Sequence, residues 1–433
     1  MNPGQAASEK SVFSDTGYSL LLVSGIEFHN IRGEVYQVSL RKVVKQNPAV
    51  KKHLYGIRKY LYYMALTPLK AAKVDQKKIL FNNFQGMSYA GNPRAIADKM
   101  HEMDPSVKLL WLCAEKGIEN TLPAYVSPVR MDTPRYFYEI ATSGTWVFNI
   151  MPARGLLKKK EQLYIQTYHG DRAIKKVHYQ NIGKKETDHK YAIHDDICDY
   201  GVVGSESGAV MFRDGIGFHG PLIREGTPRD DCLVHPDPKR YKKIKRRLKV
   251  AENEKLLLYA PTFRAGNDAL KTKIDFERLL DLLQKKTGDT WRCLYRAHFH
   301  TSSIQMQNSD TSRYIDVSKY PDMADLLMVS DMLITDYSSS SGDFCITGKP
   351  VIMFIDEEEN YPRSLVIDMD ASPFMVVHTQ EQLEQLIVSL DEAAVEENKR
   401  ALIEFFGIHE TGHAAEACCK VILEHIKRNS KKV

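Results

Sequence analysis

Residues 331–349, DMLITDYSSSSGDFCITGK, contain residue types that bind phosphate groups. An apolar run ends at Asp336, and the serines at 338–341 then lead into a predicted helix. Serine hydroxyls and the unpaired backbone N–H groups at a helix start both favour a negatively charged ligand. The pattern predicts an anion site at this point, although a serine-rich helix start without a ligand has the same pattern.

Two further predicted strands end in cations. Arg264 follows the run YAPTF, and Arg296, His298 and His300 lie in LYRAHFH. Ligands of doubly wound sheets bind beyond the carboxyl ends of the strands. If these two ends and the serine-rich end meet in one crevice, they would surround a phosphorylated ligand with Arg, His and hydroxyl groups, as phosphoryl transfer without a metal requires. Each arginine alone fits an ordinary surface position equally well, so the coincidence of all three ends carries the prediction.

His169 ends another predicted strand, LYIQTYHG, and is followed by Gly170. A histidine has a pKa near neutrality, so it can take a proton from an attacking hydroxyl group. The glycine beside it would allow a substrate to approach closely. The alternative is a histidine with a purely structural role.

Residues 409–413, HETGH, match the H-E-x-x-H pattern of zinc proteases. We reject a zinc site because Gly412 weakens the helix that would have to hold both histidines on one face, and no third ligand follows at a suitable spacing. The sequence contains no Walker A loop and no G-x-S-x-G elbow. No metal is therefore expected.

Short apolar strands alternate with helical segments from residue 77 onward, which indicates parallel sheets covered on both faces. The first set comprises strands KILFNNF, VKLLWLC, WVFNI and LYIQTYHG, with an Asn-capped helix at 92–103 and a second helix at 134–144. The second set comprises strands LLLYAPTF, TWRCLYRAH, DMLITDYSSS and KPVIMFID, with helices near 276–286 and 323–330. Two sets predict two doubly wound domains.

The first 75 residues differ from the rest of the chain. They contain two predicted short strands, at 19–23 and 35–40, and the segment 51–73, which mixes Lys and Arg with Tyr, Leu and Met. Such a helix suits the headgroup layer of a membrane, but it would equally suit docking on the protein itself. The basic run KRYKKIKRRLKV at 239–250 is a second candidate contact with anionic lipid or a polyanionic product, or simply a solvated helix face.

The overall composition restricts the possible classes of protein. The chain has 433 residues, of which 43% are hydrophobic and 27% charged, so a disulfide scaffold and wholesale disorder are excluded. A net charge of +5 is too small to demand nucleic acid. Seven cysteines without C-x-x-C spacing and a start without a secretion signal predict a reduced, cytoplasmic protein. No apolar window is long enough to span a bilayer, so any membrane contact should be peripheral.

An ordered series of motifs resembles the CDP-glycerol glycerophosphotransferase family, whose members build teichoic acids and related polymers. The motifs are FNNFQGMSYAGNPRAIADKM, RYFYEIATSGTWVFNI, YIQTYHG, GTPRDD, YAPTFR, RAHFH, ITDYSSSSGDF and GKPVIMF. The resemblance covers roughly residues 77–415 in the family's order. It implies an α/β fold of the GT-B type, with two Rossmann-like domains facing a cleft. It also implies transfer without an essential metal and peripheral attachment to the inner face of the cell membrane.

The resemblance also implies roles for individual residues. His169 corresponds to the family's candidate base, and Arg264, Arg296 and His298 to groups around the donor pyrophosphate. Asp336, Ser338 and Ser339 match the family's T-D-Y-S-S element, and Asp343 matches the acidic residue after it. A turn containing Gly226, Pro228, Arg229 and Asp231 matches G-x-P-R-N-D. The chain departs from the family at Asp171 and Arg172, where H-G-T-P-L-K is usual, and at Phe299, where R-x-H-P is usual.

We therefore expect a transferase that moves a phosphoalditol, foremost glycerol phosphate from CDP-glycerol, to a hydroxyl group of a lipid-linked or polymeric acceptor and releases CMP. The expected organisation is an appendage (1–75), an acceptor domain (76–238), a CDP-donor domain (239–395) and a helical C-terminal segment (396–433). The alternatives are a GT-B glycosyltransferase that uses a nucleotide sugar and a non-catalytic protein that binds membrane or polymer. The sequence does not settle the donor alditol, the acceptor, or whether the chain forms a homo-oligomer.

Overall fold

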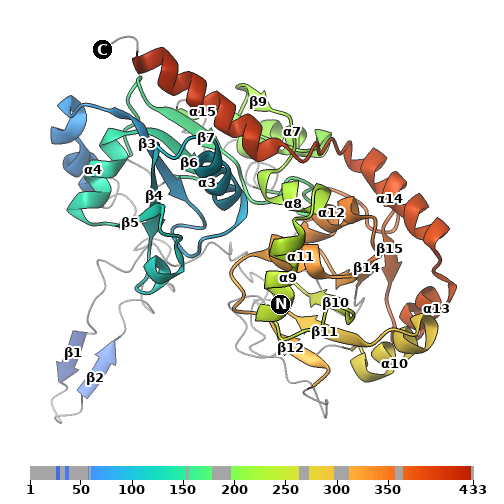
Figure 1. The fold of residues 1–433 in the computed structure, drawn as a ribbon. Coiled ribbons are helices and arrows are strands. Elements are labelled where there is room, and N and C mark those ends of the chain that lie inside the picture. The colour runs from blue at the N-terminus through green and yellow to red at the C-terminus, as the bar shows by residue number, and fades with distance from the viewer. Residues whose placement is uncertain are drawn as a thin grey trace, which may run out of the picture.

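The computed structural model describes residues 26–29, 35–38, 57, 60–152, 156–177, 197–262, 273–296, 312–355 and 364–430. The described chain forms two parallel sheets, each with its own helical layers (Figure 1). The predicted strand at 19–23 and the site residues Arg264, His298, Phe299 and His300 lie outside the described residues.

The first sheet has the strand order β5-β4-β3-β6-β7-β8-β9, and its neighbouring strands are all parallel. Its strands are β3 (Asp75–Asn82), β4 (Lys108–Cys113), β5 (Val126–Arg130), β6 (Ser143–Phe148), β7 (Leu163–Gln166), β8 (Tyr200–Val202) and β9 (Leu222–Ile223). The central strands are continuous apolar runs because both faces of the sheet are covered.

The second sheet repeats this arrangement with the order β12-β11-β10-β13-β14-β15, again parallel throughout. Its strands are β10 (Lys255–Ala260), β11 (Trp291–Tyr295), β12 (Tyr314–Asp316), β13 (Met332–Thr335), β14 (Val351–Phe354) and β15 (Met375–Val377). The order reverses beside the first strand of each sheet, as in Rossmann-like folds. The predicted fold class of two doubly wound domains is confirmed.

Helices cover both faces of the first sheet. On one face lie α3 (Gly91–Met103) and α15 (Ala414–Ser430), which pack on side chains such as Phe81 and Trp111. On the other face lie α4 (Pro134–Thr142) and the helical residues 60–66, which pack on Trp146 and its neighbours.

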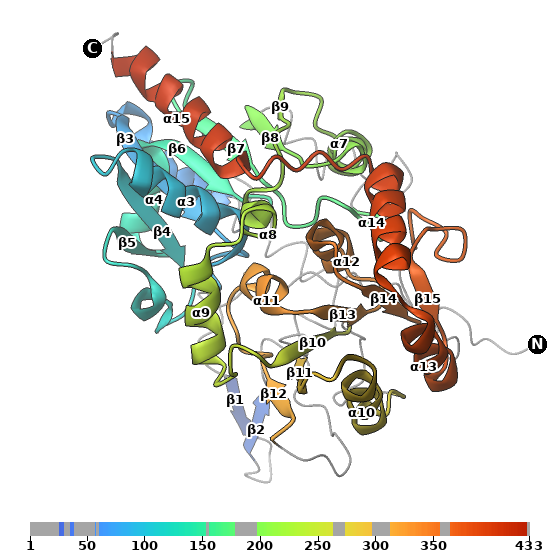
Figure 2. The ribbon, with the colours of Figure 1, turned by 45° about the vertical axis from the view of Figure 1, so that its right-hand side comes forward.

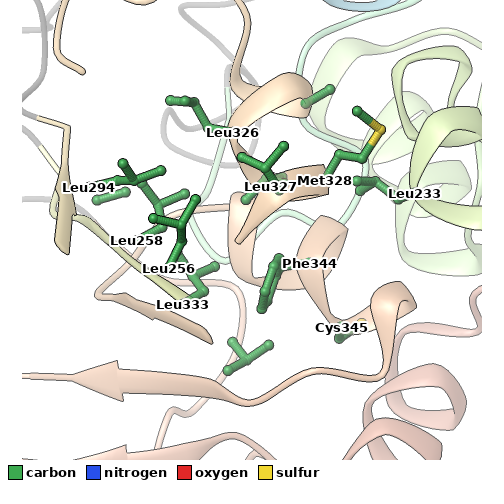
Figure 3. Packing of buried hydrophobic residues seen from close by; sticks show 14 of the residues in the cluster. Leu233, Leu256, Leu258, Leu294, Leu326, Leu327, Met328, Leu333, Phe344 and Cys345 are labelled. Atoms are coloured by element: carbon green, nitrogen blue, oxygen red, sulfur yellow. The ribbon is translucent and has the colours of Figure 1, made fainter. Parts of the chain in front are cut away.

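The second sheet is covered in the same way. One face carries α9 (Pro238–Arg247), α11 (Met323–Val329), α12 (Ser340–Phe344) and α14 (Glu392–Phe406), and the other carries α10 (Phe276–Thr287) and α13 (Gln380–Ser389). Figure 3 shows Leu256, Leu258 and Leu333 from the strands packed against Leu327 of α11 and Phe344 of α12. The serine-rich segment is thus fixed to its sheet by the buried ring that follows it.

The two C-terminal helices pack on different halves of the molecule. Helix α14 covers the second sheet, whereas α15 crosses back and lies on the first, beside α3 (Figures 1 and 2). The chain therefore passes between the halves twice among the described residues, near residue 235 and near residue 410.

Shorter elements complete the described chain. They are β1 (Ile26–His29), β2 (Val35–Val38), α7 (Glu206–Val210), α8 (Asp231–Val234), the 3-10 turns Pro68–Ala71, Ile118–Thr121, Pro228–Asp230 and Cys345–Thr347, and a π-helical turn Met211–Ile216. Strands β1 and β2 form an antiparallel pair. All seven cysteines are buried free thiols.

Two local predictions were wrong. Helix α3 begins after Ala90, without a side-chain cap, because Asn92 lies inside its first turn and bonds elsewhere. The predicted helix at 51–73 ends at residue 66 in the described chain, where Pro68 starts a 3-10 turn.

Candidate active site

The residues that follow the strands at the reversal of strand order lie at the carboxyl ends of the two sheets. In the first half, Asn83 and Phe84 follow β3 and Asn149 follows β6. In the second half, Thr262 follows β10 and donates hydrogen bonds to Asp336, which follows β13, at 2.9 Å from its backbone N–H and 3.0 Å from its hydroxyl group. Crevices at such reversals are where doubly wound folds bind ligands.

His169 follows β7, the strand next to β6, and its ring is held in one orientation. Its Nδ1 lies 3.0 Å from the backbone carbonyl oxygen of Asn149. Because a carbonyl can only accept, Nδ1 must carry the hydrogen, and Nε2 is then the atom that accepts a proton. The ring also stacks on Tyr168, with centroids 4.2 Å apart.

The surroundings of His169 keep its imidazole neutral. Burial, together with the positive charge of Arg229, lowers its pKa to about 4, against the opposing effect of the hydrogen bond to Asn149. Arg229 Nη1 donates to the carbonyl oxygen of His169 at 2.8 Å. At neutral pH the ring is therefore an unprotonated base.

Asn92 holds the loop that carries His169. From the first turn of α3, its side-chain amide donates to the carbonyl oxygens of Thr167 and Tyr168, both at 3.1 Å. Its carbonyl oxygen accepts from the backbone N–H of Arg229 at 3.1 Å. One buried side chain thus ties α3, the β7 loop and the turn at Arg229 together.

The serine-rich segment of the second half meets this loop. A Cβ atom added to Gly170 would lie 3.1 Å from the hydroxyl oxygen of Ser339, so the two halves are in close contact here. Ser338 and Ser340 share a hydrogen bond of 2.8 Å, whereas Ser339 stands at the start of α12 without making a side-chain cap. Helix α12 has only five residues, so the hydroxyl groups offer more to an anion than a helix dipole does.

Arg296 lies at the end of β11 in the second half. Its Nη1 donates to the carbonyl oxygen of Tyr320 at 2.8 Å, and burial lowers its pKa from an already high value. The guanidinium therefore remains charged at neutral pH and is oriented by one backbone contact.

A buried cluster of charges, the Arg172 cluster, lies beneath the contact between the halves. It comprises Asp171, Arg172, Arg229, Asp230, Asp343 and Glu410. The Arg172 guanidinium has no exposed surface and lies 2.8 Å from Asp230 and 3.0 Å from Asp343. It also pairs with Glu410, and Arg229 pairs with Asp343. Asp343 thus directs its two oxygens to arginines of the first half.

Four carboxylates and two arginines leave the cluster with an excess of negative charge. Burial raises the pKa of Glu410 to about 6 and raises that of Asp230 well above its usual range, with Asp343 adding to the latter effect. The cluster therefore retains protons that exposed carboxyl groups would have lost.

The HETGH segment contributes Glu410 to this cluster. Residues 409–413 form no helix, and Gly412 has a φ of +75°. The two histidines consequently do not share a helix face, which the zinc-protease motif requires. Within the described ranges, no three His, Cys, Asp or Glu side chains are grouped as metal ligands.

Comparisons with known proteins identify the family of this chain. The family model described as CDP-Glycerol:Poly(glycerophosphate) glycerophosphotransferase matches residues 63–424. The chain belongs to this family. The resemblance recognised from the motifs is thereby confirmed.

Among curated members of the glycerophosphotransferase family, the teichoic acid glycerol-phosphate transferase of Staphylococcus aureus (strain NCTC 8325 / PS 47) is 27% identical over 399 residues, covering 85% of this chain and 99% of that protein. The teichoic acid poly(glycerol phosphate) polymerase of Bacillus subtilis (strain 168) is 28% identical over 309 residues, covering 66% of this chain but only 40% of the polymerase. A polymerase from Staphylococcus epidermidis is likewise covered over 42% of its length. A solved structure of the wall teichoic acid polymerase TagF superposes with a TM-score of 0.74 at 24% identity, covering 88% of this chain and 99% of that chain, which supports the fold.

Several residues of this candidate site were not predicted as site residues. Phe84 and Asn149 lie in motifs that match the family, FNNFQGMSYAGNPRAIADKM and RYFYEIATSGTWVFNI, but their contacts with His169 are tertiary, as is the contact between Arg172 and Glu410. Arg229 had a signal, because it lies in the GTPRDD turn that matches the family. Glu410 also lies in a recognisable motif, HETGH, but that pattern is typical of a zinc site and does not indicate an ion pair.

Proposed function

We propose that this protein transfers a phosphoalditol from a CDP-alditol, foremost glycerol phosphate from CDP-glycerol, to a hydroxyl group of its acceptor. The observation that carries the proposal is His169, a neutral imidazole with its Nδ1 fixed by a carbonyl and its loop against Ser339 of the other half. Family membership supports the same reaction. In this proposal the first half binds the acceptor and the second half binds the donor.

The proposed reaction is a single displacement at phosphorus. The acceptor hydroxyl oxygen bonds to the phosphorus that carries the alditol, and its proton passes to Nε2 of His169. The bond between this phosphorus and the bridging oxygen breaks, and CMP leaves with the electron pair. Arg296 and the hydroxyl groups of Ser338 and Ser339 would stabilise the negative charge on the phosphates. Asp336 would orient the neighbouring strand end through Thr262.

Arg264 and His298 remain proposed donor contacts by family resemblance, since both lie outside the described residues. Asp343 is better explained as a support of the donor segment than as a direct phosphate contact, because its oxygens face Arg172 and Arg229. We retain it in the site with this supporting role. The reaction as written needs no metal.

A donor panel tests the proposal. The protein is incubated with CDP-glycerol, CDP-ribitol and UDP-glucose, each with a short poly(glycerol phosphate) acceptor, and the released nucleotides are separated. We expect CMP from a CDP-alditol and no turnover of the nucleotide sugar. Release of UDP from the nucleotide sugar would instead support the glycosyltransferase alternative. Absence of any turnover would support the non-catalytic alternative.

We also propose that the protein works at the anionic inner face of the cell membrane, where a lipid-linked acceptor is available. The exposed apolar side chains here are Ile57, Tyr60, Leu61, Tyr63 and Met64, whereas Tyr62 and Leu66 anchor the helical residues 60–66 on the first half. One face of the helix is therefore docked on the protein, and the exposed face is the one that would contact the membrane in this proposal. Exposed apolar patches of this kind suit a membrane interface.

A cavity of about 260 Å³ beside this helix adds basic groups. It is lined by Leu66, Leu69, Lys70, Ala141, Leu157, Lys158, Lys159 and Lys160. Lysines next to apolar side chains suit an anionic lipid surface. Within the described residues, no helix is long and apolar enough to cross a bilayer.

The basic run of α9 supports membrane binding less strongly. Lys245 is buried, with its ammonium bonded to backbone carbonyl oxygens of residues 251, 252 and 254. Arg240 pairs with Asp325, and Arg247 lies over the ring of Tyr320. Part of the run therefore holds α9 in place, and only its outer lysines and arginines remain available for lipid.

A further inference from the structure

Phe84 is an exposed aromatic side chain beside the proposed base. It follows β3, the strand at which the order of the first sheet reverses, and 45% of its surface is exposed. Its ring centroid lies 5.0 Å from that of His169, with 54° between the planes. The ring of Phe84 has no role in the proposed reaction.

The backbone at Phe84 is strained. Phe84 and Gln85 have φ values of 45° and 58°, and Gly86 continues the left-handed run with 78°. A left-handed conformation costs about 1–3 kcal/mol for a residue other than glycine. Burial of the Phe84 side chain offsets only part of this cost, since 45% of its surface is exposed.

The surrounding contacts enforce this conformation. The Phe84 backbone N–H donates to the side-chain oxygen of Asn149 at 2.8 Å. Gly86 donates to the carbonyl oxygen of Asn83 at 2.9 Å and accepts from Ala114 at 3.0 Å. A Cβ atom on Gly86 would lie only 2.7 Å from the backbone nitrogen of Ala114, so only glycine fits there.

Asn149 holds Phe84 and His169 in one frame. Its backbone carbonyl accepts from the His169 ring, and its side-chain oxygen accepts from Phe84. Its amide group donates to the side-chain oxygen of Asn83 at 2.6 Å, and Asn83 in turn donates to Ser88. Asn83 and Asn149 are both buried, so the ring and the base are fixed relative to each other.

The chemistry of the ring indicates which part of a substrate it contacts. The face of an aromatic ring is electron-rich, so it attracts C–H groups and repels phosphate oxygens. An alditol phosphate offers a carbon chain with C–H groups between its phosphates. A platform that holds this chain beside Nε2 of His169 would align one hydroxyl group for attack.

We propose that Phe84 is the acceptor-binding platform of this site, with the C–H face of the acceptor's terminal alditol lying on its ring. This inference rests on the proposed function, because it assumes an alditol acceptor deprotonated by His169. It adds a residue that selects and positions the acceptor rather than the donor.

The test separates the use of acceptor from the use of donor. F84A removes the ring, F84N removes it while retaining a residue that tolerates left-handed φ, and F84Y retains it. Phe405, which is 44% exposed on α14, provides the matched control F405A. The measurements are the melting temperature, CDP affinity, and kcat and KM with a short poly(glycerol phosphate) acceptor.

We expect F84A and F84N to lower kcat/KM for the acceptor by roughly tenfold or more, about the loss of one aromatic contact, with CDP affinity unchanged. F84Y retains the aromatic face and should restore most of the acceptor use that F84A loses, whereas F405A should resemble the parent. The platform assignment is wrong if folded F84N uses the acceptor as well as the parent does. It is also wrong if CDP affinity falls by the same factor as kcat/KM for the acceptor. In both cases the proposed function stands. If the parent itself releases no CMP, the proposed function fails and this inference fails with it.

Discussion

At the scale of single residues, the tautomer and charge of His169 are set by its neighbours. The Asn149 carbonyl fixes the hydrogen on Nδ1, and burial together with Arg229 keeps the ring neutral. A base must be unprotonated before the acceptor binds, and this environment ensures that down to about pH 5. Negative phosphates of a bound donor would then raise the pKa of the ring and make it a stronger base when it is needed.

We predict that Arg229→Gln moves the acid limb of kcat/KM to higher pH. Loss of the positive charge raises the pKa of His169, so the ring becomes protonated, and inactive as a base, at a pH where the parent still works. The measurement is kcat/KM from pH 4 to 9. Arg229→Lys retains the charge and should retain the parent's limb. An unchanged limb in Arg229→Gln would show that Arg229 does not influence the base.

The position of His169 after a strand was predictable, because a polar residue at the end of an apolar run is visible in the sequence. Asn149 and Phe84 were not, because one acts through a backbone carbonyl and the other through a strained loop. Asn92 was misassigned as a helix cap because the local pattern cannot reveal that its amide reaches the loop after β7.

At the scale of elements, the strand ends bring the two halves of the site together. The β7 loop touches the α12 segment at Gly170 and Ser339, and β11 ends at Arg296 on the same carboxyl edge of the second sheet. Because the strands are parallel, all these ends face one side of their sheet. The alternation of strands and helices sufficed to predict this edge.

We predict that Arg296→Ala and Ser339→Ala weaken donor binding much more than acceptor use. Both residues lie on the donor side, and hydrogen bonds to a charged phosphate are each worth about 1.5–3 kcal/mol. Titration with CDP measures donor affinity, and KM for the acceptor measures acceptor use. Ser389→Ala, at the end of α13, is a matched serine control. Unchanged CDP affinity in both variants would place the donor elsewhere.

Element boundaries were less predictable than the elements themselves. The serine-rich run predicted a helix but not its length, and α12 has five residues. The basic and aromatic segment was predicted as one helix, but a 3-10 turn begins at Pro68. Both ends depend on what packs behind them, namely Phe344 in the second core and Leu66 in the first.

At the scale of the whole molecule, the Arg172 cluster joins the halves. Arg172 follows β7 in the first half, and Asp343 lies in α12 of the second half. Glu410 lies in the irregular segment that leads to α15. Three segments remote in sequence therefore meet at one guanidinium. The ion-pair partners of Arg172 could not be predicted from the sequence. The departure from the family motif at Asp171 and Arg172 does not reveal which carboxylates balance the charge of the arginine.

We predict that Arg172→Met lowers the free energy of unfolding by about 3–5 kcal/mol at pH 7.5, because it leaves buried carboxylates unpaired. Lowering the pH toward 5 protonates Glu410, whose pKa burial raises to about 6, so the deficit relative to the parent should shrink. Urea denaturation at both pH values is the measurement. Arg213→Ala removes an exposed pair with Asp214 and should cost less than about 1 kcal/mol. A deficit that is small, or that grows at low pH, would contradict this account of the cluster.

We predict co-sedimentation with anionic but not neutral vesicles, partly reversed by salt, since charges are screened beyond about 8 Å at physiological ionic strength. Leu61→Glu with Met64→Glu should abolish the salt-resistant part. Changing Lys242, Lys243, Arg246 and Arg247 to Glu should reduce the salt-sensitive part, and Lys243→Glu with Arg246→Glu is the cleaner variant because it spares the Arg247 contact with Tyr320. A parent protein that ignores anionic vesicles at low salt would show that these surfaces are merely solvated.

The most direct test of the central claim follows the phosphorus atom itself. CDP-glycerol labelled at the phosphorus that bears glycerol is incubated with a short poly(glycerol phosphate) acceptor and either the parent or His169→Ala. We predict that the label enters a new phosphodiester of the acceptor, that one CMP appears for each transfer, and that His169→Ala lowers the rate by about 100-fold or more while it melts as the parent does. Label that leaves with the nucleotide as CDP, or equal rates for the parent and the variant, would contradict phosphoalditol transfer by His169.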